Sequence, residues 1–401
     1  MDVVNSSHSY ATGGTSVNEF WSEPKRLATT LQTENEESCS THNMLKVCSF
    51  DILTSFTAYY VLSFLLKRYS ERKGTWLLMI YMLPLGHGVS KSRSFHKWGT
   101  KFYSFGVVMG QGTGKSSTLN VRIPSWTDSS GANAFLNDAD LSLPTQGNFL
   151  SVSRKWSSGD KLSLEFPISL RTEAISDDRP ESASIQAILY GPYLLAGLSS
   201  GDWDLKTETK PSQLDWITAI PPSYNSQLIS LQQQSSNETF VLMNSNNAIT
   251  MEKMPESGTD AALQATFRFV DDGAIRPSWV AGGAGGKNQN LAVGDTEGSS
   301  MFRVVTGLDK KGTVSLESVS QKGCFLYTGV NYKAGTKIRL SCRSGLKDAA
   351  FPQATSFKLS KGLSEYHPIS FVANGAKRKF LLMPLLSMRD ESYTVYFNRG
   401  A

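Results

Sequence analysis

Short runs of alternating apolar and polar residues, each ended by a turn signal, most constrain how this chain can fold. From Leu119 onward such runs recur about every ten residues, a spacing typical of antiparallel all-β domains. Leu119–Ile123 stops at Pro124, and Lys161–Phe166 follows a Ser-Ser-Gly-Asp turn. Ile185–Tyr190 ends at Gly-Pro, and the chain holds 33 glycines and 15 prolines, which suits a turn-rich protein. We predict an antiparallel β-sandwich over residues 117–205.

The last third of the chain repeats itself with a period of 55 residues. The pairs at this offset are Phe302/Phe357, Gly307/Gly362, Leu308/Leu363, Leu316/Phe371 and Phe325/Phe380. They bracket strand-like runs, and a repeated four-strand unit of this length is typical of a β-trefoil. Because a trefoil needs three copies, we expect a degraded copy near residues 261–310 and a trefoil over residues 261–401.

Two segments are less regular. Residues 1–116 show helical apolar spacing only in pieces, which do not add up to a compact domain. The stretch Asp204–Glu238 is polar and rich in Ser and Gln, which indicates loops or a connection, and residues 206–260 are predicted to be a connecting segment. The predicted fold class is mostly β, an antiparallel sandwich followed by a trefoil.

Charge, hydropathy and one short motif argue against several classes of function. The net charge is +5 and the basic residues are spread out, without an arginine-rich run carrying interleaved aromatics, so we expect no nucleic-acid partner. The longest apolar run, Phe56–Leu66, is eleven residues and falls short of the ~20 that a membrane-spanning helix requires. Gly110–Ser116 is similar to a phosphate-binding loop, but Met109 stands where its first glycine belongs, so we do not predict nucleotide binding.

The four cysteines form two pairs in the sequence. Cys39 and Cys48 are close together, and Cys324 and Cys342 are 18 residues apart on either side of a predicted hairpin. The second pair has two alternatives, which are a cross-strand disulfide and two buried free thiols. A disulfide would imply an oxidising compartment.

Signals for export are mixed. Asn5-Ser-Ser and Asn237-Glu-Thr match the glycosylation sequon, although such short motifs often arise by chance. The first residues carry neither a basic region nor an apolar core, so no signal peptide is expected.

Three long motifs carry a family resemblance. The block Tyr10–Cys39, which contains YATGGTSVNEFW and ENEESC, and the later Met79–Gly86 and Trp98–Thr100 resemble the catalytic barrel of plant β-L-arabinofuranosidase-like glycoside hydrolases. Residues from Leu119 to about Trp203 resemble the sandwich that follows this barrel. The C-terminal third resembles an arabinose-binding module of the α-L-arabinofuranosidase B type, which is a β-trefoil.

The resemblance implies a fold and a function. Residues 1–116 would be a remnant of an α/α barrel, most of which is absent from this chain. The function would be L-arabinofuranosidase-like glycoside hydrolysis, within L-arabinose metabolism. The partners would be arabinose-containing polysaccharides or glycoprotein glycans, outside the cell or in the plant cell wall.

By the same resemblance, the family retains anomeric configuration with a thiolate nucleophile held on zinc and a carboxylic acid as acid/base. Glu19 matches the acid/base position. Glu37 and Cys39 match two zinc ligands. Zinc lowers the pKa of a thiol and so makes it a nucleophile at neutral pH.

The two adjacent cysteines that complete the family's site are replaced in this chain. Val107 and Val108 occupy their positions, and an alternative register places Met109 and Gly110 there. Neither register supplies a thiol, and two ligands of four do not make a zinc site. We therefore expect a glycoside hydrolase by family that has lost its nucleophile, binds no zinc and is truncated and catalytically impaired.

The C-terminal module keeps few polar anchors for a sugar. Asp390 fits the family's sugar-binding aspartate, whereas Thr328 and Met383 stand at the histidine positions. We expect His367 to be structural. Three tyrosines could stack on a furanose, although trefoil aromatics are more often core: Tyr327, Tyr332 and Tyr366. Two alternatives stay open, which are a non-catalytic carbohydrate-binding protein acting through the trefoil and an aberrant gene product that does not fold.

Overall fold

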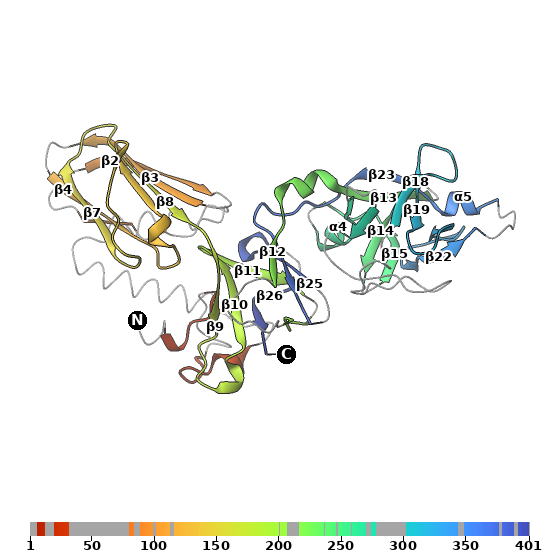
Figure 1. The fold of residues 1–401 in the computed structure, drawn as a ribbon, viewed down its shortest axis with the longest axis horizontal. Helices are drawn as coiled ribbons and strands as arrows, with labels where there is room; N and C mark the ends of the chain where they lie inside the picture. Colours follow the sequence, from red (N-terminus) through yellow and green to blue (C-terminus); the bar gives the residue numbers. More distant parts are fainter. Residues whose placement is uncertain are drawn as a thin grey trace. The chain divides into compact units, whose positions relative to one another are not determined.

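The computed structural model describes residues 6–12, 20–31, 80–83, 89–98, 102–112, 116–199, 201–206, 216–235, 237–245, 248–257, 259–269, 274–277, 302–343, 349–376, 379–388 and 392–400. The protein is mostly β, in agreement with the prediction (Figure 1). It divides into two compact units, of which the first holds Met1–Leu195 and Val395–Phe397 and the second the remainder. The boundary falls within β11 (Tyr193–Leu198), and each unit is described by itself.

The first unit contains two antiparallel sheets that lie as two layers (Figure 1). One sheet has the order β2 (Val89–Trp98), β3 (Phe102–Gly112), β8 (Lys161–Pro167), β5 (Asn133–Leu136) and β6 (Ala139–Asp140). The other has the order β1 (Ile80–Leu83), β4 (Ser116–Arg122) and β7 (Phe149–Lys155). Alternate residues of β7 and β8 are buried, as the alternating sequence predicts for strands with one face toward a core.

The sandwich begins earlier than the sequence analysis places it. β2 and β3 fall within residues 1–116, yet β3 pairs with β2 on one side and β8 on the other. Tyr103, Val107 and Met109 of β3 are buried, two or four residues apart, so one face of this strand lies in the core. Of residues 1–79, the structure describes only 6–12 and 20–31, which include the 3-10 helix η1 (Leu27–Thr30). The barrel remnant therefore stays a prediction.

A second group of strands in this unit contains the turn that the sequence predicts after Tyr190. β9 (Leu170–Ala174), β10 (Ile185–Tyr190) and β11 pair in sequence order. The pairing of Tyr190 with Tyr193 leaves a two-residue turn that contains Gly191, at φ 54°. A Cβ at Gly191 would lie 2.5 Å from a methyl group of Ile168, so this turn requires glycine.

Six strands of the second unit close into a ring. They are β13 (Leu228–Ser235), β16 (Phe267–Phe269), β17 (Ala274–Pro277), β18 (Phe302–Thr306), β19 (Val314–Ser318) and β23 (Ser356–Lys361). Each pairs antiparallel with the next, and β23 pairs back with β13. Leu231, Leu316 and Phe357, one from each of three ring strands, belong to one buried cluster. The ring therefore encloses a hydrophobic core.

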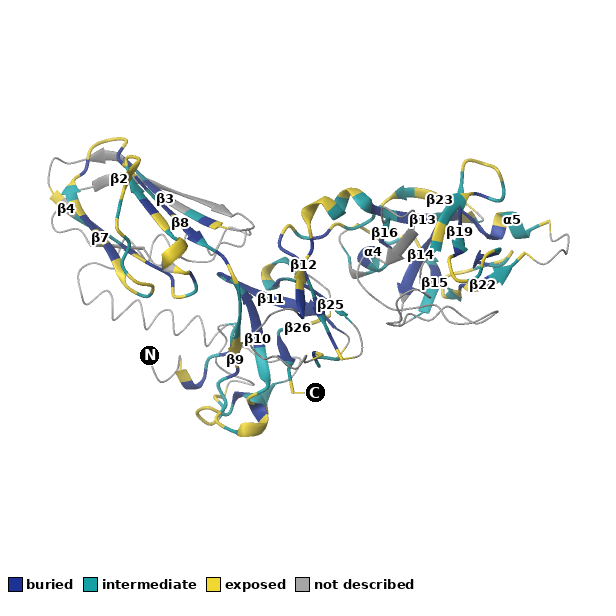
Figure 2. Ribbon diagram, in the orientation of Figure 1, coloured by how far each residue is buried: buried dark blue, intermediate teal, exposed yellow. Residues whose placement is uncertain are grey.

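Two groups of strands extend this ring. β14 (Glu238–Ser245), β15 (Ala248–Lys253) and β21 (Thr336–Lys337) continue outward from β13. β20 (Cys324–Tyr327) and β22 (Arg339–Cys342) continue from β19. Figure 2 colours β14 largely as buried, and Phe240 and Leu242 of this strand join the cluster inside the ring.

The prediction of a connecting segment over residues 206–260 is corrected by the structure, because this segment contains the strands β13, β14 and β15. Its Ser and Gln residues suggested loops, but several of them are buried and hydrogen-bonded. The Ser230 hydroxyl donates to the Lys361 carbonyl at 3.0 Å, and the Gln233 amide donates to the Ser356 carbonyl at 2.8 Å. Because a bonded polar side chain can be buried at little cost, these residues form strands.

The 55-residue repeat predicts where strands lie but not which strands they pair with. Phe302 and Phe357 lie in β18 and β23, and both strands belong to the ring. Leu316 lies in β19 of the ring, whereas its counterpart Phe371 lies in β24 (Phe371–Asn374). β24 pairs with β12 (Ile217–Ala219) and β25 (Lys379–Pro384), outside the ring. Much of the expected third copy lies outside the described residues.

Short elements complete the described chain. They are η2 (Ser129–Gly131), η3 (Pro180–Ser182), η4 (Pro222–Gln227), α4 (Asp260–Gln264), α5 (Phe351–Ala354), η5 (Leu385–Ser387), β26 (Tyr393–Thr394) and β27 (Tyr396–Asn398). Within the described part, the protein has no helix of the length and apolarity needed to cross a membrane.

Candidate functional site

Four predicted site residues lie outside the part of the chain that the structure describes. They are Glu19, Glu37, Cys39 and Asp390. Their roles as acid/base, zinc ligands and sugar-binding aspartate therefore remain predictions.

Val107 and Val108, which the sequence analysis predicts to stand at the positions of the family's cysteines, lie in the middle of β3. Val107 pairs with Leu162 of β8 and Val108 with Lys161, so β3 is an interior strand of its sheet. Val107 is buried, at 1% exposure, and Val108 is half-buried. Neighbouring residues of a strand point to opposite faces of its sheet. Sulfur atoms at these two positions would therefore lie on opposite faces and could not both bind one ion.

The described residues at the predicted cysteine positions offer zinc no suitable ligand. The valine side chains offer no donor atom, and the alternative register offers only the thioether of buried Met109 and the hydrogen of Gly110. Among the described residues, no three or more of His, Cys, Asp and Glu gather in a way that could hold a metal ion. No step of a zinc-dependent reaction can be derived from these residues.

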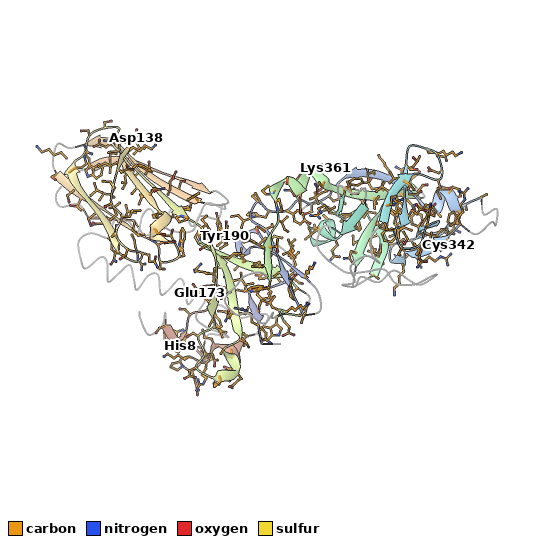
Figure 3. The ribbon with its side chains drawn as sticks, in the orientation of Figure 1. His8, Asp138, Glu173, Tyr190, Cys342 and Lys361 are labelled. Atoms are coloured by element: carbon orange, nitrogen blue, oxygen red, sulfur yellow. A yellow bond between two sulfur atoms is a disulfide. The ribbon has the colours of Figure 1, made fainter. Side chains whose placement is uncertain are left out.

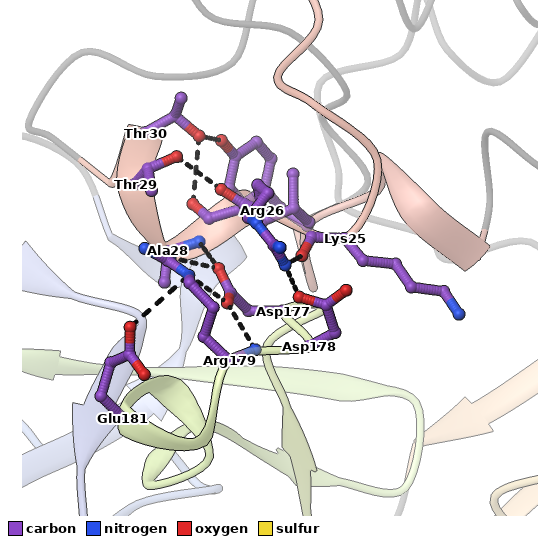
Figure 4. A network of polar contacts seen from close by, with 11 residues as sticks. Lys25, Arg26, Ala28, Thr29, Thr30, Asp177, Asp178, Arg179 and Glu181 are labelled. Atoms are coloured by element: carbon purple, nitrogen blue, oxygen red, sulfur yellow. Dashed lines mark hydrogen bonds and ion pairs between the residues drawn. The ribbon is translucent and has the colours of Figure 1, made fainter.

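The described N-terminal segment is held by a buried carboxylate, that of Asp177 (Figure 4). The side chain of Asp177 is 0% exposed. The Arg179 guanidinium donates to both of its oxygens, at 2.8 and 2.7 Å, and the Ala28 backbone N–H donates at 3.1 Å. These bonds, those from Arg179 foremost, hold the pKa of Asp177 well below its usual range.

Backbone contacts strengthen this attachment. The Asp178 N–H donates to the Lys25 carbonyl at 3.1 Å, and the Leu27 N–H donates to the Ser176 carbonyl at 3.3 Å. Arg26 forms an ion pair with Asp178. Residues 25–28 and 176–179 are therefore joined by both backbone and side-chain bonds, although they are about 150 residues apart in sequence.

His8 was not singled out by the sequence analysis, yet it is buried in this region (Figure 3). Its ring stacks on Trp21 with the centroids 5.3 Å apart. Its Nδ1 atom is buried without a hydrogen-bond partner among the described residues. Trp21 is 49% exposed and Phe20 is 76% exposed, so this aromatic group reaches the surface. The only sequence signal for His8 is its place two residues before Tyr10.

The aromatic residues of the C-terminal module belong mainly to the core, as expected. Tyr327 is buried, with Phe351 stacked 5.6 Å away and the Arg339 guanidinium 4.9 Å from its centroid. Tyr332 meets Phe240 edge to face, and burial raises its pKa to about 12. These rings are already occupied by protein side chains.

Tyr366 and His367 are also structural. Tyr366 is buried, and its backbone N–H and C=O bond to the Asn225 side chain at 2.8 and 3.0 Å. The Nδ1 atom of His367 accepts the N–H of Ile369 at 3.0 Å. Burial lowers the pKa of His367, and the contact between its Nδ1 atom and the Ile369 carbonyl, at 3.1 Å, opposes the shift. These contacts support the expectation that His367 is structural, which stays a prediction.

Thr328 and Met383, for which the sequence resemblance predicts histidine positions of a sugar site, make internal contacts. The Thr328 hydroxyl is buried and bonds to the Ala354 carbonyl at 2.9 Å and to the Gln233 side-chain carbonyl at 3.1 Å. Met383 packs against a buried cluster that includes Leu381 and Tyr366. Thr328 therefore fixes the interior of the module and does not line an open site.

The two C-terminal cysteines form a disulfide. Cys324 in β20 pairs directly with Cys342 in β22, and their sulfur atoms are 2.00 Å apart (Figure 3). Of the two alternatives in the sequence analysis, the cross-strand disulfide is confirmed. It links β20 and β22, the two strands that extend the sheet outward from β19 of the ring.

Comparison with known proteins finds two matching family profiles. Residues 1–51 match the β-L-arabinofuranosidase GH127 catalytic domain, and residues 104–168 match the GH127 middle domain. Val107 and Val108 fall within the second match. Together the matches span less than half of the chain. No curated protein matches it significantly.

Solved structures with detectable similarity include family members. A GH127 β-L-arabinofuranosidase from Geobacillus stearothermophilus T6 is 14% identical and has a TM-score of 0.27, over 77% of this chain and 30% of its own. Another GH127 β-arabinofuranosidase is 11% identical with a TM-score of 0.29, over 80% and 33%. A GH54 α-L-arabinofuranosidase is 8% identical with a TM-score of 0.27, over 65% and 53%.

These scores are too low to support a fold assignment, and the chain spans only about a third of the length of the two GH127 structures. The profile matches are the stronger finding. They occur in the order of the family's domains and point to the β-L-arabinofuranosidase GH127 family.

Proposed function

We propose that this chain is an L-arabinofuranosidase-type glycoside hydrolase of the GH127 family in a truncated and catalytically impaired form. The observation that carries the proposal is the pair of profile matches, which are to the catalytic domain at residues 1–51 and the middle domain at residues 104–168. The described parts of these segments lie in one compact unit. The chain thus has recognisable parts of a family enzyme in the family order.

The proposed impairment follows from Val107 and Val108. A retaining glycosidase needs a nucleophile close to its acid/base, and a hydrocarbon side chain cannot serve. Loss of a nucleophile costs on the order of 10⁴ to 10⁶ in turnover. The burial of Val107 in a sheet core supports a structural role for this position.

The proposed substrates are arabinose-containing polysaccharides or glycoprotein glycans outside the cell or in a plant cell wall, with Glu19 as the acid/base inherited from the family. Zinc, with Glu37 and Cys39 as two of its ligands, would be the family's cofactor. We propose that this chain does not retain it. The disulfide supports an oxidising location for the protein.

We also propose that the closed ring of the second unit is the barrel of a β-trefoil. A trefoil barrel has six strands and threefold symmetry. Alternate ring strands would then carry equivalent hairpins, and β13 and β19 each carry an extension of this kind. Sugar binding by this module is not advanced as a second function, because Thr328 and Tyr327 are occupied by internal contacts. The role of Asp390 in sugar binding remains a prediction.

The test compares the full chain with an intact GH127 enzyme on an aryl L-arabinofuranoside, with zinc measured by mass spectrometry. We expect turnover lower by a factor of about 10⁴ or more and a zinc content near zero. One tightly bound zinc per chain together with ordinary turnover would overturn the proposal.

A cysteine variant makes the test sharper. The double substitution Val107→Cys, Val108→Cys restores the family's residue types but places them on opposite faces of β3. We expect it to gain neither zinc nor activity. The matched control is Val107→Ser, Val108→Ser, and circular dichroism shows whether both variants keep their strands. Zinc binding and hydrolysis by the cysteine variant alone would contradict the structural argument.

A further inference from the structure

The glycosylation sequon Asn237-Glu-Thr lies at the tip of a β-hairpin. Ser235 of β13 pairs with Glu238 of β14, so the loop between the strands has only two residues, 236 and 237. Asn237 has a φ of 65° and is exposed. The sequon therefore occupies a protruding turn and not a buried strand.

Turn geometry alone explains an asparagine here but not the complete motif. Two-residue hairpin loops require positive φ, which Asn, Asp and Gly tolerate. The β5–β6 turn has the same length, with Asn137 at φ 49°. The Asn137 side chain donates to Asp160 at 2.7 Å and accepts from the Lys161 N–H at 2.7 Å, so its amide is consumed within the protein. Among the described residues, none forms such a bond with the Asn237 side chain.

The surroundings of Asn237 leave room for a large substituent. Glu238 and Lys253 form an ion pair at 2.8 Å, and their side chains are 51% and 64% exposed. A group attached to the Asn237 amide would project into solvent beside this ion pair. No buried side chain of the ring would have to move.

The disulfide gives an independent indication of compartment. Cys324 and Cys342 are in the same unit as Asn237, and structural disulfides form in oxidising compartments such as the secretory pathway. Asparagine glycosylation takes place in the same pathway on surface turns. Exposure, turn geometry and redox environment therefore agree.

We propose that Asn237 is a site of N-linked glycosylation. The donor is an oligosaccharide attached to a lipid diphosphate, and an oligosaccharide transferase catalyses the step. A bond forms between the Asn237 amide nitrogen and C1 of the first sugar, and the bond from C1 to the diphosphate oxygen breaks. The lipid diphosphate leaves with the electron pair, and the amide proton passes to a base of the transferase. No atom is oxidised or reduced.

The experiment expresses the full chain behind a secretion leader in eukaryotic cells. Peptide mass spectrometry, before and after enzymatic removal of N-glycans in heavy-oxygen water, locates each occupied asparagine and separates Asn237 from the Asn5 sequon. We expect a glycan on Asn237 in the wild type and in Thr239→Ser, which keeps the sequon. Asn237→Gln and Thr239→Ala should lose it. Asn137→Gln changes the comparable turn outside any sequon and should keep it.

The same sample is treated with a thiol-alkylating reagent to show whether Cys324 and Cys342 are oxidised. An unmodified Asn237 in secreted, disulfide-bonded protein would overturn the proposal. Freely alkylated cysteines in the secreted chain would remove the compartment argument, and the occupancy of Asn237 would then decide the proposal by itself. Neither outcome depends on hydrolase activity, so the two proposals fail separately.

Discussion

Replacing Asp177 with alanine tests how the first unit holds its N-terminal segment. The wild-type carboxylate is fully buried and accepts bonds from Arg179 and from the backbone N–H of Ala28. The substitution removes the close partner of Arg179, whose guanidinium keeps an ion pair with Glu181 at 3.9 Å, and leaves the Ala28 N–H without its acceptor. We therefore expect residues 25–28 to detach more readily from residues 176–179.

The burial of Asp177 sets the expected change in the free energy of opening of this segment. Breaking a buried ion pair by removing one partner costs roughly 3–5 kcal/mol. Arg179 is 29% exposed and can regain some hydration, so we expect a value near the lower end, about 3 kcal/mol. Such a change raises the population of the open segment by about 100-fold.

Hydrogen exchange at the amides of Leu27 and Ala28 measures this opening directly. The control is Asp178→Ala, which removes the ion pair with Arg26. Asp178 is 54% exposed, and pairs at exposed positions contribute at most about 1 kcal/mol. If Asp177→Ala accelerates exchange no more than Asp178→Ala does, the buried carboxylate does not hold the segment and the reasoning is wrong.

The pH dependence supplies a second readout. Arg179 holds the pKa of Asp177 below its usual value, which is about 3.9 in an unfolded chain. A folded-state pKa below the unfolded one gives stability that is fully present above about pH 4 and is lost as pH falls toward the folded pKa. The difference between wild type and Asp177→Asn should therefore be constant from neutral pH to about pH 4 and shrink below it.

Three further predictions concern the second unit. The double substitution Cys324→Ser, Cys342→Ser opens an 18-residue loop and should destabilise the unit by about 3 kcal/mol in thermal unfolding under oxidising conditions. A difference from wild type that is seen only under reducing conditions, or under neither oxidising nor reducing conditions, would contradict this. Gln233→Ala removes the buried bonds that this side chain makes to the Ser356 carbonyl and the Thr328 hydroxyl, and it should cost about 2 kcal/mol in urea unfolding, against at most about 0.5 kcal/mol for the exposed neighbour Gln234→Ala. Burial raises the pKa of Tyr332 to about 12, so its stabilising contribution is full below about pH 10 and is lost as pH rises toward 12. Ultraviolet titration of wild type against Tyr332→Phe should assign to this tyrosine an ionisation well above pH 10, and ordinary ionisation near pH 10 would contradict it.

The sequence predicted strands well wherever local pattern and burial coincide. β7 and β8 alternate between apolar and polar residues, and the structure buries the apolar ones. The Gly-Pro after Ile185–Tyr190 marks a turn that requires glycine because Ile168 lies against it. The pairing of Cys324 with Cys342 was one of two alternatives, since cysteine spacing does not show which strands are neighbours.

The sequence failed where polar residues are buried. Ser230 and Gln233 looked like loop residues because their bonding partners, Lys361 and Ser356, are more than 100 residues away. The aromatic site at His8 was missed for the same reason, because its stacking on Trp21 depends on the chain returning to it. The predicted catalytic residues Glu19, Glu37 and Cys39 lie outside the described residues.

What the sequence by itself determined is local: the strand periodicity, the turn residues and the family motifs, from which the loss of the expected cysteines at Val107 and Val108 was predicted. Tertiary structure alone decided that these two valines lie on opposite faces of an interior strand. It also decided that β13 closes the ring by pairing with β23, and that β24 pairs with β25 outside the ring. The physical reason is that side-chain alternation specifies which face of a strand is buried. Hydrogen-bonded pairing between strands far apart in sequence depends on contacts that no local pattern encodes.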